Sequence, residues 1–212
     1  MQEGDLILTP NWTWHDHRHD SSLPILWLDG LDGPLIHNFN VLFFEEFTSE
    51  VQAIIRPDGD SGRRFSFARF PLDGDTGLTG TPFRYRWDET YAALKSINDT
   101  AADPYDGALI RFVNPHSGGF TLPTISCEMQ LLNPGCKTMS HRHTSTVLYH
   151  VFRGRGRTAV GDSFLEWQKG DCFAIPLWLR HHHENGSGEE SLLFSINDRP
   201  LLEATGWYQT ED

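Results

Sequence analysis

The sequence has few cysteines and no long apolar run. Three of its 212 residues are cysteine, at positions 127, 136 and 172, and no two of them form a CxxC pair. The N-terminus has neither a basic segment nor a long apolar one, so we expect no secretory signal. These two absences predict free thiols and a cytoplasmic protein. No apolar stretch approaches the ~20 residues that cross a bilayer, so we expect no membrane segment.

Basic residues are also scarce. Lys and Arg number 17 against 29 Asp and Glu, which gives a formal net charge of −12. A nucleic-acid partner is therefore not expected, because phosphate binding requires clustered basic side chains. A small anionic ligand is not excluded, since one arginine can override the overall field locally.

What the sequence does have predicts an all-β fold with few short helices. It contains 19 Gly and 12 Pro, and from residue 108 onward short β-prone runs alternate with turn residues. We expect a short helix over residues 88–98 with Asp88 as its N-cap, and the apolar spacing over 35–47 is near-helical. The tail 199–212 is expected to begin with one helical turn and then fray. The predicted strands cover residues 108–113, 124–132, 146–152, 157–160, 163–167, 172–176 and 191–196.

Two segments of the chain repeat one another. Residues 4–17, GDLILTPNWTWHDH, and residues 170–183, GDCFAIPLWLRHHH, match at Gly, Asp, Pro, Trp and two His when they are aligned at an offset of 166. This agreement predicts two copies of one domain. At the same offset, the counterpart of His141 would lie before residue 1. We therefore expect a first copy that is cut in its middle, through truncation or a mis-assigned start.

Three histidines have the spacing of a metal site. His141 and His143 are two residues apart in a strand-like segment, so their side chains share a face. His181 follows a Gly-Asp turn and Pro176, which would bring a third imidazole from a neighbouring strand. Three neutral imidazoles suit Fe, Zn, Cu or Ni better than Mg or Ca, and an open coordination face is typical of catalytic sites. The alternative is three barrel-lining histidines that bind nothing.

The residues around these histidines resemble the two cupin motifs. The first is Gly135-x5-His141-x-His143 with Gly154 after it, and the second is Gly170-x5-Pro176-x-Trp178-x2-His181 with Asn185 after it. The glutamate usual in the first motif is absent, because Val147 or Leu148 stands in its place. A three-histidine set without glutamate resembles the gentisate 1,2-dioxygenase family, as do the runs at 9–17, 27–35, 141–151 and 192–208.

This resemblance implies a double-stranded β-helix of the cupin (jelly-roll) type, arranged as a bicupin. The first barrel would be incomplete and the second complete. The domains expected are 1–47, a remnant of the first cupin with a connecting helix; 48–107, a linker with a short helix; and 108–212, the complete cupin.

The resemblance also implies a function. The family cleaves the ring of 2-hydroxybenzoates, so it implies Fe(II) as cofactor, with O2 and an aromatic acid such as gentisate or a hydroxynaphthoate as substrates. It further implies a homo-oligomer, a dimer or a tetramer. Two other readings stay open: a cupin isomerase that uses the metal as a Lewis acid, and a non-catalytic or truncated metal-binding module.

Further residues are candidates for the two sites. The repeat makes His15 the surviving ligand of the first site, and the resemblance places His17 and Asp29 there as acid/base groups. Arg180 is a candidate for holding the substrate carboxylate and Trp178 for forming a wall of the pocket. Arg142 and Arg111 compete with Arg180, and spacing alone does not separate the three.

Overall fold

The structure is a computed structural model that describes residues 1–9, 11–60, 83–115 and 117–212. The chain divides into two compact units. We call Met1–Leu6 with Tyr85–Asp212 the barrel unit, and Ile7–Arg84 the N-terminal unit. Residues 61–82 of the predicted linker lie outside the described residues, and the predicted domain bounds stay a prediction. Among the residues described, every helix is too short or too polar to cross a lipid bilayer.

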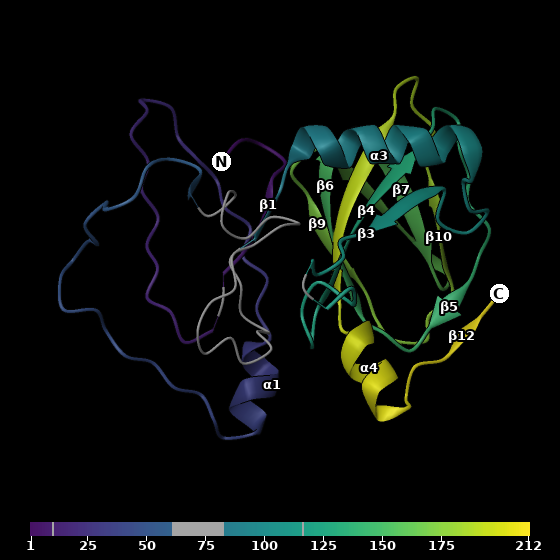
Figure 1. Ribbon diagram of the computed structural model, residues 1–212. Coiled ribbons are helices and arrows are strands. Elements are labelled where there is room, and N and C mark those ends of the chain that lie inside the picture. Colours follow the sequence, from purple (N-terminus) through teal and green to yellow (C-terminus); the bar gives the residue numbers. More distant parts are fainter. Residues whose placement is uncertain (10, 61–82, 116) are drawn as a thin grey trace. The chain divides into compact units, whose positions relative to one another are not determined.

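The barrel unit is built around two main antiparallel sheets (Figure 1), which confirms the predicted all-β cupin fold. The larger sheet has the order β3-β4-β11-β6-β9 and the smaller one β10-β7-β8, while β5 pairs separately with β12. The strands are β3 Ala108–Arg111, β4 Ser126–Leu132, β5 Arg142–His143, β6 Val147–Arg153, β7 Arg155–Val160, β8 Ser163–Gln168, β9 Cys172–Ile175, β10 His181–Glu184, β11 Ser191–Asn197 and β12 Thr210–Glu211.

The two faces of the larger sheet have different partners. Along β4, Met129 and Leu131 point to the outer face and share an apolar cluster with Leu94 of the helix α3, Trp87–Thr100. Glu128 and Gln130 alternate with them and point into the barrel, as a strand period of two requires. A second apolar cluster, which includes residues of β4, β6, β8, β9 and β11, fills part of the interior. The remaining interior is polar, and the histidines lie there.

The predicted helix at 88–98 is confirmed as α3, but it begins earlier than predicted. Its N-cap is Arg86, with an extended backbone, and Asp88 lies in the first turn instead of capping it. The Arg86 side chain bonds that carboxylate at 2.8 Å, which fixes the entry to the helix. Figure 1 shows α3 lying across the larger sheet, where it covers the outer apolar face.

The near-helical spacing over 35–47 predicts more helix than the N-terminal unit contains. The helix α1 spans Gly33–Asn38 only, and Asn40 has a left-handed backbone with φ of 56°. Phe43 and Phe44 follow outside any helix or strand and are exposed. Periodic spacing without a face to pack against does not maintain a helix. The strand β1, Leu6–Leu8, pairs with β2, Phe83–Tyr85.

The two copies of the repeat share their backbone conformation. Trp12 and Trp178 both have positive φ, at 61° and 63°, and the glycines that open the copies have φ of 89° and 94°. In each copy the Asp side chain accepts a hydrogen bond from the amide three residues earlier, at 2.8 Å for Asp5 and 2.9 Å for Asp171. A non-glycine residue with positive φ is uncommon, so the agreement at both tryptophans supports a common origin of the two segments.

The tail is more ordered than predicted. After the helix α4, Arg199–Thr205, the chain turns at Gly206 in the left-handed conformation and returns along the barrel. There Thr210 pairs with His143 and Glu211 pairs with Arg142. The expectation of fraying is wrong, because strand pairing and side-chain ion pairs bind these residues to β5.

Candidate metal centre

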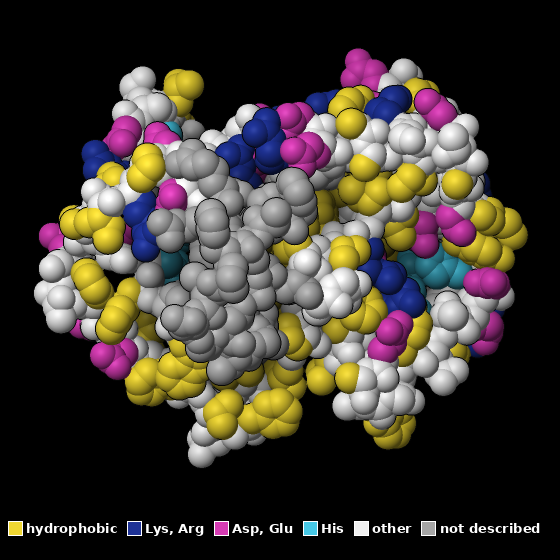
Figure 2. Space-filling model, viewed as in Figure 1, with side chains coloured by type: hydrophobic (Ala, Val, Ile, Leu, Met, Phe, Trp, Pro, Cys, Tyr) yellow, Lys and Arg dark blue, Asp and Glu magenta, His cyan; other side chains and the backbone are white. Residues whose placement is uncertain are grey.

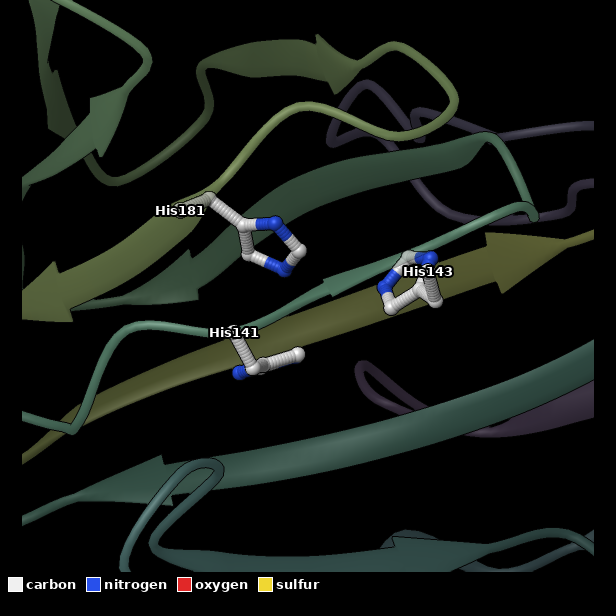
Figure 3. Close-up of side chains that lie close together, drawn as sticks. All are labelled: His141, His143 and His181. Carbon is white, nitrogen blue, oxygen red and sulfur yellow. The ribbon is translucent and has the colours of Figure 1, made fainter. Parts of the chain in front are cut away.

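The three histidines come from two neighbouring segments that are joined by backbone hydrogen bonds. His141 and His143 lie on one segment, and His181 lies on the other. The amides of His141 and His181 each donate to the other's carbonyl oxygen, at 3.1 and 2.9 Å. The three side chains extend into the same space (Figure 3), with ring centroids 4.4 to 5.6 Å apart. One nitrogen from each ring lies within 4.8 Å of the other two, and no other such cluster occurs among the described residues.

The hydrogen bonds of His143 and His181 are made by Nδ1, which leaves Nε2 of each ring free to bind a metal. Nδ1 of His181 lies 3.0 Å from the Leu179 carbonyl oxygen, and Nδ1 of His143 lies 2.9 Å from that of Ser145. A carbonyl only accepts, so Nδ1 of His181 carries the proton and its Nε2 keeps a lone pair. Nδ1 of His143 also lies 3.0 Å from the hydroxyl of Ser145. Nε2 of His181 and Nδ1 of His141 are buried without a hydrogen-bond partner. In His181 a buried, unpartnered nitrogen on one side of the ring and a carbonyl on the other side are the arrangement of a metal ligand.

Burial keeps these imidazoles neutral. It lowers the pKa of His181 to about 3 and also lowers the pKa values of His141 and His143. Protons therefore compete weakly with a metal for the three nitrogens at neutral pH. The three candidate ligand atoms lie within 4.8 Å of one another, so His141, His143 and His181 could hold one ion together. The donor set fits Fe, Zn, Cu or Ni.

The neighbouring histidines of β10 have different partners. His182 points outward, where its Nε2 lies 2.9 Å from a carboxylate oxygen of Glu184. His183 shares the inner face with His181 and is fully buried, but its Nδ1 lies 2.8 Å from the hydroxyl of Thr158. His181 is therefore the member of this run that joins His141 and His143, as the spacing from Pro176 predicts.

The barrel interior beside the cluster is polar. Tyr105 meets the His141 ring edge-on at 5.7 Å. Gln130 is 1% exposed, and its Oε1 has no hydrogen-bond partner. Arg111 points inward from β3 and donates to Glu128 at 2.8 Å, so its charge is already matched. Sequence reasoning missed Gln130, although the alternation of polar and apolar residues along β4 is a signal that would have found it.

Arg180 and Trp178 lie beside the histidines on the outer side of the strands. The guanidinium of Arg180 donates to the Glu211 carboxylate. The amide of Trp178 donates to the His143 carbonyl oxygen at 2.7 Å, and the guanidinium of Arg142 lies 4.5 Å from the centre of its ring. Figure 2 shows histidine side chains reaching the surface where Figure 1 labels β5 and β10, with acidic and basic side chains around them. The roles in substrate binding stay predictions.

The first-site candidates lie in the N-terminal unit and are exposed. Nδ1 of His15 lies 3.3 Å from the Thr13 carbonyl oxygen, and its ring centroid is 5.9 Å from that of His17. The His17 ring in turn packs against Trp27 at 4.6 Å. Asp29 is exposed as well. The structure does not bring these three side chains into a metal-binding group among the residues that it describes.

The barrel and its histidine cluster define a cupin, and residues 128–197 match the family model of the Cupin domain. The chain is a homologue of the gentisate 1,2-dioxygenases, which confirms the resemblance predicted from the motifs. It is 36% identical to gentisate 1,2-dioxygenase 1 of Aquipseudomonas alcaligenes over 99% of the chain and 60% of that protein. It is 38% identical to the 5-aminosalicylate 1,2-dioxygenase of a Comamonas species over 100% of the chain and 56% of that protein.

A solved structure shares the same fold. A variant of the salicylate 1,2-dioxygenase from Pseudoaminobacter salicylatoxidans, in complex with gentisate, superposes with a TM-score of 0.86 at 31% identity. The match covers 100% of the present chain and 60% of the other one. The chain thus spans somewhat more than half the length of the relatives that it matches.

Proposed function

We propose that the chain acts in an Fe(II)-dependent dioxygenase that opens the ring of gentisate or a related 2-hydroxybenzoate or hydroxynaphthoate. The observation that carries the proposal is the cluster of neutral, buried His141, His143 and His181 in a homologue of ring-cleaving dioxygenases. Three ligands on one side would leave the opposite side of the ion open to substrate and O2. The iron would supply the electronic route between the aromatic ring and O2.

The residues of the chain would hold and orient the reactants. His141, His143 and His181 would bind the metal through the nitrogens that the carbonyls leave free. Arg180, which donates to Glu211 in this structure, would also pair with the substrate carboxylate. Trp178, whose ring stacks on Arg142, would form a wall of the pocket. A fixed charge and an apolar surface of this kind would orient the substrate so that the bond between its carboxyl-bearing and hydroxyl-bearing carbons is cleaved.

For the N-terminal unit we propose the roles that the repeat implies. His15 corresponds to His181 and would be a ligand of a first metal site. His17 and Asp29 would serve there as acid/base groups that handle the proton of the substrate hydroxyl. The positive φ at both repeat tryptophans supports this correspondence.

The remaining features of the proposal concern the setting of the protein. We infer a cytoplasmic enzyme, because Cys127, Cys136 and Cys172 are free thiols in the structure. We also infer a homo-oligomer, a dimer or tetramer. Light scattering on the purified chain measures that mass, and a monomer would contradict this inference.

Oxygen uptake tests the activity. The purified chain is loaded anaerobically with Fe(II), and gentisate is then added in an oxygen-electrode cell. We expect one O2 to be consumed per gentisate, and we expect H143A to lose both bound iron and uptake. H182A is the matched control, since His182 points away from the cluster, and it should retain both.

Each of the other outcomes has a meaning. Bound iron without oxygen uptake on gentisate, salicylate or 1-hydroxy-2-naphthoate would contradict the dioxygenase and favour the non-catalytic module. Conversion of an added substrate without O2 would favour a Lewis-acid isomerase. Iron binding that survives in H143A would contradict the assignment of the ligands.

A further inference from the structure

The three candidate ligands lie on two chain segments that must keep a fixed separation. His141 and His143 belong to the segment that contains β5, and His181 begins β10. The two segments are joined by the backbone pair between His141 and His181 and by the amide of Trp178, which donates to the His143 carbonyl at 2.7 Å. A metal that binds all three rings depends on this junction.

A third segment pairs with the strand that carries His143. The strand β12 pairs with β5, so that Thr210 faces His143 and Glu211 faces Arg142. The contact continues at Thr144, whose amide donates to the Gln209 carbonyl at 3.0 Å and whose hydroxyl donates to the Trp207 carbonyl at 2.9 Å. Residues 207–211 therefore lie along the edge of the strand that carries two of the ligands.

One carboxylate in this segment bridges both ligand segments. Nη2 of Arg142 donates to Oε2 of Glu211 at 2.7 Å, and Nη2 of Arg180 donates to its Oε1. Arg142 stands between His141 and His143 in the sequence, and Arg180 immediately precedes His181. Because side chains alternate along a strand, the outward Arg142 moves together with the inward imidazoles on either side of it.

We propose that Glu211 is a positioning residue for the metal centre, which ties Arg142 to Arg180 and thereby fixes the distance between the two ligand segments. This inference rests on the proposed function only in assuming that the three histidines bind a metal. Glu211 touches neither the imidazoles nor the space between them. Its effect would pass through the backbone of the adjacent residues.

The expected size of the effect follows from outer-shell residues in other metal sites, whose loss weakens metal binding 10- to 100-fold. Glu211 acts through neighbours of the ligands, and its side chain is 44% exposed. We therefore expect the low end of that range, about tenfold. Exposed ion pairs are screened by salt, so the difference between native chain and variant should shrink at high ionic strength.

Titration with Co(II) tests the proposal without any need for catalysis. The absorption bands of bound Co(II) report the geometry of the ligands, and their growth gives the dissociation constant. We expect E211Q and E211D to weaken Co(II) binding about tenfold and to shift the bands. E211D keeps the charge but shortens the side chain by one methylene. It therefore separates the effect of side-chain length on Co(II) binding from the effect of charge.

E190Q is the matched control. Glu190 is also a bridging carboxylate, which accepts hydrogen bonds from Tyr91 on α3 and from Arg153 on β6, but it contacts neither ligand segment. Its replacement should lower the urea midpoint and leave Co(II) affinity unchanged. The urea midpoint of every variant shows whether it is folded before it is titrated.

The outcomes distinguish the two proposals. Equal Co(II) affinity and bands in the native chain, E211Q and E211D would overturn the role of Glu211 and leave the three-histidine site intact. Weak binding in E211Q alone would assign the effect to charge and would also overturn positioning. If the native chain binds no Co(II), the metal site of the proposed function fails, and the role of Glu211 fails with it.

Discussion

The hydroxyl of Thr158 joins two buried polar groups at the centre of the barrel, so its removal should destabilise the fold strongly. Thr158 is fully buried, its Oγ1 lies 2.9 Å from Nε1 of Trp167, and it lies 2.8 Å from Nδ1 of His183. The indole nitrogen can only donate. The hydroxyl therefore accepts from Trp167, and its other hydrogen bond is made with Nδ1 of His183.

The structure gives the magnitude for T158V. Valine has nearly the shape of threonine, so little cavity forms, but Trp167 and His183 each lose their partner. An unsatisfied buried polar group costs about 1–3 kcal/mol, so the expected loss is about 2–6 kcal/mol in the free energy of unfolding. T158S is the control, because it keeps both hydrogen bonds and loses one methyl group, at about 1 kcal/mol.

Urea unfolding of the metal-free chain, followed by far-UV circular dichroism, measures both variants. We expect the midpoint of T158V to fall well below that of T158S, with similar slopes. A T158V chain at least as stable as T158S would refute the hydrogen-bond argument. It would mean that the fit of the side chain matters at this position and its hydroxyl does not.

Three further predictions concern stability. Burial raises the pKa of Asp106 to about 7, so the native chain should lose stability relative to D106N as the pH rises from 4 through 7. The expected loss is about 2 kcal/mol after allowance for partial exposure of the carboxyl group. Parallel pH profiles of the unfolding free energy in the two chains would contradict this prediction. Burial lowers the pKa of His181 to about 3, so the metal-free chain should lose stability relative to H181N as the pH falls from 6.5 toward 3. A difference in unfolding free energy between the two chains that stays constant with pH would contradict this prediction. In G156A the new Cβ would lie 2.4 Å from the Glu184 carbonyl and 2.5 Å from the Trp167 ring. This crowding should lower the free energy of unfolding in urea by about 1–3 kcal/mol. An unchanged urea midpoint would show that the surrounding atoms move aside without cost.

Much of the barrel could be predicted from the sequence because its signals are local. The predicted strands correspond to β3, β4, β6, β7, β8, β9 and β11, and a strand period of two places His141 and His143 on one face. The helix at 87–100 also has its signal nearby, in apolar residues spaced along one face. The over-long helix at 35–47 has the same kind of signal, but Phe43 and Phe44 stay exposed. Periodicity describes what a segment could bury and does not show whether a partner surface exists.

The neighbourhood of the candidate metal centre depends on pairings that no local pattern encodes. Glu211 reaches Arg142 across 69 positions of the sequence, and Thr158 reaches His183 across 25. Arginine, glutamate and threonine are common at surfaces, so nothing at these positions marks them as parts of a site. The ligands themselves are recognisable because metal chemistry restricts residue type and spacing. The groups that hold the ligands need only a suitable charge at a suitable place, and the fold of the whole chain decides that place.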